Sequence, residues 1–114
     1  MIYLTNRMGT LINNIDTNII KSELSELLLS MDQEHNSIML SNDCELYLEI
    51  YKNTLILIDR KTTAPNKENM LLNVKTQTGS VLNIIDQVEI FLKENEVNDL
   101  IKILSALPKL DQSI

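Results

Sequence analysis

The chain holds one histidine, His35, and one cysteine, Cys44, and together these residue types could form a nucleophile and its base. Their spacing argues against such a pair. If the residues at 42 and 43 turn the chain between two strands, Cys44 pairs with Ser41, and His35 lies six residues further along, about 20 Å away at roughly 3.3 Å per residue. We therefore expect a structural Cys44 that is buried or half-buried. One histidine and one cysteine also fall short of the three or four ligands of a zinc site, so we expect no metal.

Other patterns typical of catalytic or ligand-binding sites are incomplete in this sequence. Neighbouring carboxylates occur at Glu23 with Glu26 and at Glu94 with Glu96, but none stands beside a plausible second catalytic group. Residues 43–49 (DCELYLE) lack the glycine and the closing glutamate of a calcium-binding loop. With only two glycines, the chain cannot build a glycine-rich phosphate cradle. We expect no catalytic residue, no cofactor and no enzymatic activity.

The charge balance bears on the class of partner. Ten basic against sixteen acidic residues give a formal net charge of −6, which repels phosphate backbones and anionic lipid and attracts basic proteins. No apolar run approaches the roughly 18 residues that span a bilayer, and the first ten residues lack the pattern of a signal peptide. A single cysteine excludes an intramolecular disulfide, which fits a reducing compartment. We expect a cytoplasmic protein that binds neither nucleic acid nor membrane.

The length of 114 residues fits a single domain over 1–114 with one aliphatic core. Residues 2–5 (IYLT) predict a short strand. Apolar positions at helical spacing predict a helix over 17–31, capped by Asp16 or Thr17. The helix could also extend backward through three apolar residues, Leu11, Ile12 and Ile15.

The middle of the chain predicts strands. Alternating apolar residues bounded by turn residues place three strands of a meander at 37–41, 45–51 and 54–60, and a fourth strand at 70–77. The polar stretch 61–69 contains a proline and predicts a loop.

The last third of the chain predicts helices. Gly79 and Ser80 start a helix whose apolar stripe ends at Leu92, and Glu94 and Asn95 separate it from a second apolar stripe that ends before Pro108. One long helix remains an alternative, and residues 109–114 predict a loose tail. The second stripe contains Leu100, Ile101, Leu104 and Leu107, which we interpret as core or, alternatively, as a dimer surface.

These elements predict an α+β fold. We expect an antiparallel sheet of about four strands, made by the meander 37–60 and residues 70–77. An N-terminal helix and one or two C-terminal helices pack chiefly on one of its faces.

The hairpin at 44–61 predicts a binding face. With Lys52 and Asn53 as a two-residue turn, 50 pairs with 55, 49 with 56, 48 with 57 and 47 with 58, which collects leucines and isoleucines on one face. The other face mixes tyrosines with acids. We interpret it as a partner-binding site formed by Glu45, Tyr47, Glu49, Tyr51, Ile56 and Ile58. Alternatively, the two tyrosines shield the two isoleucines from water as ordinary cross-strand pairs.

In size, negative charge and α+β composition, the whole chain resembles the small acidic immunity proteins that bacteria produce with interbacterial toxins. That resemblance implies a protein without enzymatic activity that binds a cognate, basic toxin domain and covers its active site. The chain is also similar to type III secretion chaperones, through residues 23–31 (ELSELLLSM), the meander that follows and residues 81–92 (VLNIIDQVEIFL). The second resemblance implies a homodimer that binds an extended segment of a secreted effector.

Overall fold

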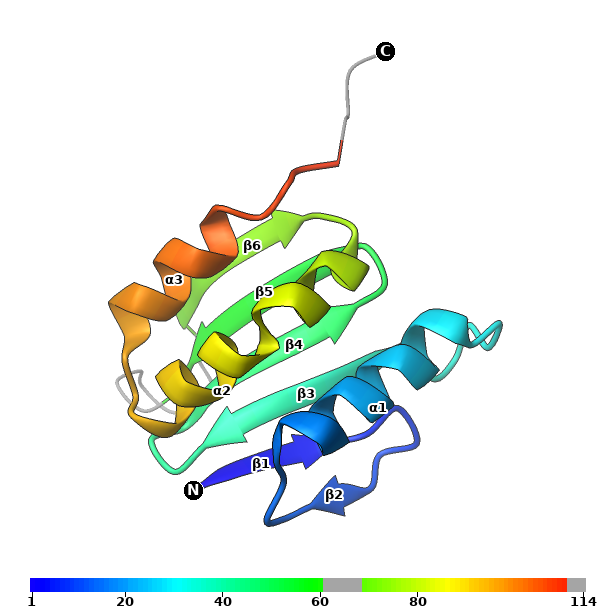
Figure 1. Cartoon of the computed structure of the whole chain (residues 1–114), viewed down its shortest axis with the longest axis horizontal. Coiled ribbons are helices and arrows are strands. Elements are labelled where there is room, and N and C mark those ends of the chain that lie inside the picture. The colour runs from blue at the N-terminus through cyan, green and yellow to red at the C-terminus, as the bar shows by residue number, and fades with distance from the viewer. Residues whose placement is uncertain (61–68, 111–114) are drawn as a thin grey trace.

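A computed structural model describes residues 1–60 and 69–110 of the chain, and it shows an antiparallel sheet with helices on one side (Figure 1). The strands are β1 (Ile2–Thr5), β2 (Leu11–Ile12), β3 (Ser37–Asn42), β4 (Leu46–Tyr51), β5 (Thr54–Asp59) and β6 (Asn69–Lys75), in the order β2-β1-β3-β4-β5-β6. The helical elements are α1 (Thr17–Leu29), the 3-10 helix η1 (Thr78–Ile84), α2 (Ile85–Lys93) and α3 (Val97–Ser105). The predicted α+β class is confirmed, with six strands in the sheet instead of about four.

The two additional strands lie at the N-terminus. The predicted strand 2–5 is confirmed as β1, and it pairs with both β2 and β3. A turn leads from β1 to β2, in which the Asn6 side chain accepts hydrogen bonds from the backbone N–H groups of Met8 and Thr10, at 3.0 Å each. Gly9 adopts a left-handed backbone conformation in this turn, with φ +84°. Leu11 and Ile12 therefore form a strand and do not extend the helix backward.

Helix α1 begins as predicted and ends two residues early. Asp16 caps it, because its carboxylate accepts a hydrogen bond from the Ile19 N–H at 2.9 Å. At the other end the backbone of Ser30 turns to an extended conformation, and its N–H bonds back to the carbonyl groups of Glu26 and Leu27. Met31, the last residue of the predicted helix, lies beyond the observed one and is 91% exposed.

The predicted register between β4 and β5 is confirmed, whereas the turn between β3 and β4 differs from the prediction. Ser41 pairs with Tyr47, not with Cys44. The reason is the side chain of Asn42, whose Oδ1 accepts hydrogen bonds from the backbone N–H groups of Cys44 (2.9 Å) and Leu46 (3.1 Å). Three residues therefore form the turn, with the last of them in the left-handed region, a common three-residue hairpin loop.

The C-terminal helices are separate, which excludes the single long helix. Asn95 adopts a left-handed conformation with φ +53°, and the chain changes direction there between α2 and α3. Asn42 fixes this corner to the sheet, because its Nδ2 donates to the Leu92 carbonyl at 2.8 Å and to Asn95 Oδ1 at 3.0 Å.

The predicted loose tail is wrong for its first two residues. Lys109 forms an isolated bridge with Thr76, and the Leu110 N–H bonds to the Lys75 carbonyl at 3.0 Å. These contacts occupy the end of β6, which stops at Lys75 and not at 77. Residues 111–114 of the predicted tail and 61–68 of the predicted loop lie outside the described residues.

The described core lies between the helices and one face of the sheet. It is aliphatic, as the composition predicts, and its fully buried side chains include Leu4, Leu24, Leu27, Leu40, Leu48, Leu57, Val88 and Leu100. We call the face that contacts this core the inner face and the opposite one the outer face. All the described helices lie on the inner side (Figure 1).

Candidate functional site

The outer face carries cross-strand rows of side chains that none of the described helices covers. The strand register aligns one row across five strands, consisting of Tyr3, Ser41, Tyr47, Ile58 and Met70. The next row consists of Thr5, Met39, Glu49, Ile56 and Asn73. Tyr51 extends the face beyond the second row. A face rich in tyrosine, methionine and isoleucine with few charges has the composition of the centre of a protein interface.

Five of the six predicted site residues lie on this face. Tyr47, Glu49, Tyr51 and Ile56 are half-buried. Ile58 is 4% exposed, so the chain itself already covers most of the area that we expected it to offer to a partner.

The sixth predicted site residue, Glu45, is not on the strand, which corrects that part of the prediction. It lies in the three-residue turn before β4 with φ +58° and an exposed side chain. Its carbonyl accepts the Arg60 N–H at 3.1 Å. The Arg60 guanidinium lies over the Tyr47 ring, 4.6 Å from its centre, so this end of the face combines a cation with an aromatic ring.

Glu49 is the acid at the middle of the face. The Tyr51 hydroxyl donates to its Oε2 at a long distance of 3.5 Å, and no cationic group of the described residues lies within ion-pair distance. Partial burial and the neighbouring charge of Glu49 raise the pKa of Tyr51. Glu49 is therefore a half-buried carboxylate that the described residues leave without a positive partner.

Two hollows border the outer face near Glu49. The larger has a volume of about 610 Å³ and lies between the loop 31–36 and the turn that joins β4 to β5, with Tyr51 and Ile56 in its lining. The smaller has a volume of about 230 Å³, and its lining includes Glu49, Met39 and Arg7. Both hollows therefore border the second row, the smaller at Thr5, Met39 and Glu49 and the larger at Ile56.

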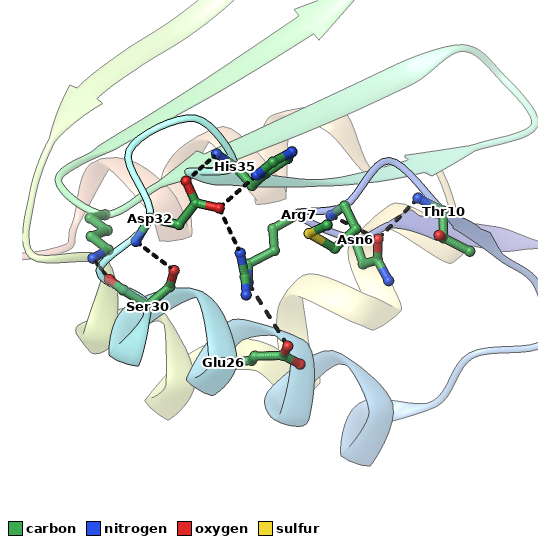
Figure 2. Close-up of polar contacts among 9 residues, drawn as sticks. Asn6, Arg7, Thr10, Glu26, Ser30, Asp32 and His35 are labelled. Carbon is green, nitrogen blue, oxygen red and sulfur yellow. Dashed lines mark hydrogen bonds and ion pairs between the residues drawn. The ribbon is translucent and has the colours of Figure 1, made fainter.

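An ionic cluster holds the loop 31–36 that walls the larger hollow (Figure 2). His35 Nδ1 lies 2.6 Å from Asp32 Oδ2, and the same oxygen is 3.6 Å from Arg7 Nη1. Arg7 Nε in turn lies 3.9 Å from Glu26 on α1. The hydrogen bond from His35, together with the Glu34 N–H, lowers the pKa of Asp32 to about 2. This cluster links the β1–β2 turn, α1 and the loop.

We did not predict this cluster from the sequence. The signal was the Asp32–His35 spacing of three residues, which lets a side chain turn back on its own loop. We had tested His35 only against Cys44. The structure places His35 before β3 begins and Cys44 after β3 ends, at opposite ends of the strand.

Three of the four residues of the alternative dimer surface belong to the core of the single chain. Leu100 and Leu104 on α3 and Leu107 just after it are buried. Ile101 is partly buried beside them. This burial favours our first interpretation of the stripe, which was core.

Within 1–60 and 69–110, no three histidine, cysteine, aspartate or glutamate side chains are grouped so that they could hold a metal ion. In the same part of the chain, no helix is both long and apolar enough to cross a membrane.

Comparison with known proteins identifies no relative: no protein-family model, curated protein or solved structure matches the chain.

Proposed function

We propose that this protein binds another protein through the outer face of its sheet and neutralises that partner by covering its functional surface, as an immunity protein does to a toxin. The observation that carries the proposal is the outer face itself, where Tyr47 and Tyr51 on β4 and Ile56 on the neighbouring β5 face the same side with no described helix over them. Tyrosine is enriched among the residues that dominate binding energy, because it combines a large apolar body with a polar tip.

Charge sets the expected character of the partner. The net charge of −6 favours a basic protein, and Glu49 at the middle of the face has no cation of its own among the described residues. A partner that supplies a lysine or arginine there gains a pair with little surrounding water. Glu45 at the exposed turn is placed to attract the same partner from a distance. The single cysteine is consistent with action in the cytoplasm.

The test is capture of a partner from the native cells by three tagged forms of the protein. The forms are the unchanged chain, the Tyr47→Thr/Tyr51→Thr double variant and an Ile90→Thr control, which alters an exposed apolar residue on α2. We expect one stoichiometric basic protein with the unchanged chain and with the control, and its loss with the double variant. The purified partner should lose its activity or its toxicity when one equivalent of the protein is added.

Two results contradict the proposal. One is a partner that all three forms capture equally, which would place the contact elsewhere. The other is a homodimer, measured by light scattering, that the double variant dissociates, because the outer face would then be occupied by a second copy. Weaker capture at higher ionic strength is expected for the basic partner, since salt screens its attraction to the acidic chain.

A further inference from the structure

The larger hollow is built to take an uncharged apolar group. Its lining includes Tyr51 and Ile56 from the outer face and the highly exposed Met31 from the loop. Its two charged residues are engaged within the chain: Asp32 binds His35, and the Lys52 ammonium donates to the Ser30 carbonyl. The rest of the lining is neutral and polar. It consists of Thr54 and three amides, Gln33, Asn36 and Asn53, whose donors and acceptors match those of a peptide backbone.

Contacts within the chain hold both walls of this hollow. On one side, His35 is hydrogen-bonded to Asp32 within the loop, and Arg7 Nη1 lies 3.6 Å from the same carboxylate. On the other side, the β4–β5 turn is held through the Lys52 carbonyl, which accepts the Thr78 N–H at 3.1 Å, and through the Asn53 carbonyl, which accepts the Thr76 N–H at 3.1 Å. Walls that are already ordered lose little conformational entropy on binding, which favours a specific contact.

The smaller hollow favours a cation. Glu49 lies in its lining without an ion pair, and the one cation among the described lining residues, Arg7, lies at ion-pair distance from Glu26 (3.9 Å) and Asp32 (3.6 Å) instead. Covering a carboxylate with a partner that brings no positive charge is costly, because the charge loses water and gains nothing in return. An occupant of this hollow is therefore expected to carry a lysine or an arginine.

The strand register sets the spacing between Glu49, which favours a cation, and the lining residues Tyr51 and Ile56, which favour an aliphatic side chain. Glu49 and Tyr51 are two residues apart on the same face of β4, and Ile56 lies opposite Glu49 on β5. Two residues of a strand span roughly 7 Å, which is also the distance between alternate side chains of an extended peptide.

From these observations we infer that the two hollows form one groove for an extended segment of the partner, with an aliphatic side chain in the larger hollow and a lysine or arginine two residues away, paired with Glu49. The inference rests on the proposed function and names the part of the outer face that recognises the partner's sequence. The row with Tyr47 supplies contact area, and the groove at Glu49 supplies selectivity.

Selection from a displayed library of random 12-residue peptides on the immobilised full-length chain tests the groove directly. We expect enrichment of peptides that carry leucine, isoleucine, valine or methionine two residues from a lysine or arginine. A synthetic winner measured by calorimetry should bind the Glu49→Lys variant at least about ten-fold more weakly, because the ion pair becomes a repulsion. The matched control is Glu94→Lys, the same charge change on an exposed residue at the corner after α2, and it should stay within about two-fold.

Circular dichroism melting of both variants separates binding from folding. The groove is refuted if no peptide is enriched, if the winners lack the basic residue, or if Glu49→Lys binds them as tightly as the control does.

The Tyr47→Thr/Tyr51→Thr and Glu49→Lys variants, used with the captured partner, distinguish this inference from the proposed function. Loss of the partner with the tyrosine variant but full binding by Glu49→Lys would support the outer face as the binding site and contradict the groove. Full binding by both variants would contradict binding through the outer face.

Discussion

Neighbouring residues of β4 offer a direct test of the two faces, because Leu48 and Tyr47 point to opposite sides of the sheet. Leu48 is 0% exposed on the inner face, whereas Tyr47 and Tyr51 are half-buried on the outer face. If the outer face is open in the free protein, truncation there should cost far less stability than truncation on the inner face, even though the residues are adjacent in sequence.

The magnitudes follow from these positions. Leu48→Ala removes three buried carbon atoms and leaves a cavity, at a cost of about 3.5 kcal/mol in the free energy of unfolding. The Tyr47→Thr and Tyr51→Thr changes introduce a β-branched residue, which strands accommodate well, and lose cross-strand contacts, and at Tyr47 also the contact with Arg60, about 1 kcal/mol each. At roughly 4 °C per kcal/mol, Tm should fall by about 14 °C for Leu48→Ala and about 4 °C for each tyrosine variant.

Urea unfolding followed by far-ultraviolet circular dichroism is the suitable assay, since it does not depend on the tyrosines being replaced. The slope of the unfolding free energy against urea concentration should be equal in all variants if they share one native state. If Tyr47→Thr or Tyr51→Thr lowers the free energy of unfolding as much as Leu48→Ala does, the outer face is not open in the free protein. A stability that rises with protein concentration in the unchanged chain, and not in the double tyrosine variant, would indicate a second copy on the same face.

Three further outcomes follow from individual contacts. Asn42→Ala should cost about 2–4 kcal/mol in urea unfolding, because the 7% exposed side chain satisfies the Leu46 N–H and the Leu92 carbonyl; a cost below about 1 kcal/mol would contradict its role at the corner. The pKa of Asp32, lowered to about 2 from its usual 3.8, makes the ionised carboxylate a stabilising group above about pH 4, and this stabilisation should disappear as pH falls through about 2. Acid titration of the unfolding free energy should therefore be flatter in Asp32→Asn, and identical slopes would contradict the cluster. The hydrogen bond to Asp43 raises the pKa of Tyr3, so ultraviolet titration of Asp43→Asn should show one tyrosine ionising at lower pH than in the unchanged chain, and an unchanged titration would contradict that bond.

Periodicity in the sequence was sufficient to predict the fold class, because the inner face is a strict alternation of aliphatic residues from Leu46 to Leu57. The same alternation predicted the β4–β5 register and five residues of the candidate face. It could not predict β2, since two residues are too short to show a period and depend on Asn6 and Gly9 for their position. Nor could it place Glu45, because side-chain hydrogen bonds of Asn42 decide the length of that turn.

The hollows were beyond sequence reasoning for a different reason. The larger is walled by a loop that contacts residues far away in the chain, such as Arg7 with Asp32, and the smaller joins the β1–β2 turn to β3 and β4. Periodicity describes single elements, and such contacts have no period. The alternative dimer surface shows the same limit, because an apolar helical stripe looks alike whether it faces its own sheet or a second copy.

The two-layer arrangement also bears on how such a protein can change over generations. Because the described core lies on the inner side of the sheet, substitutions at Tyr51, Ile56 or Met70, which is 55% exposed, leave that core intact. Most such changes should stay within the margin of stability that a domain of this size has, about 5–15 kcal/mol. The outer face can therefore follow a partner whose surface drifts, one residue at a time, while every intermediate still folds.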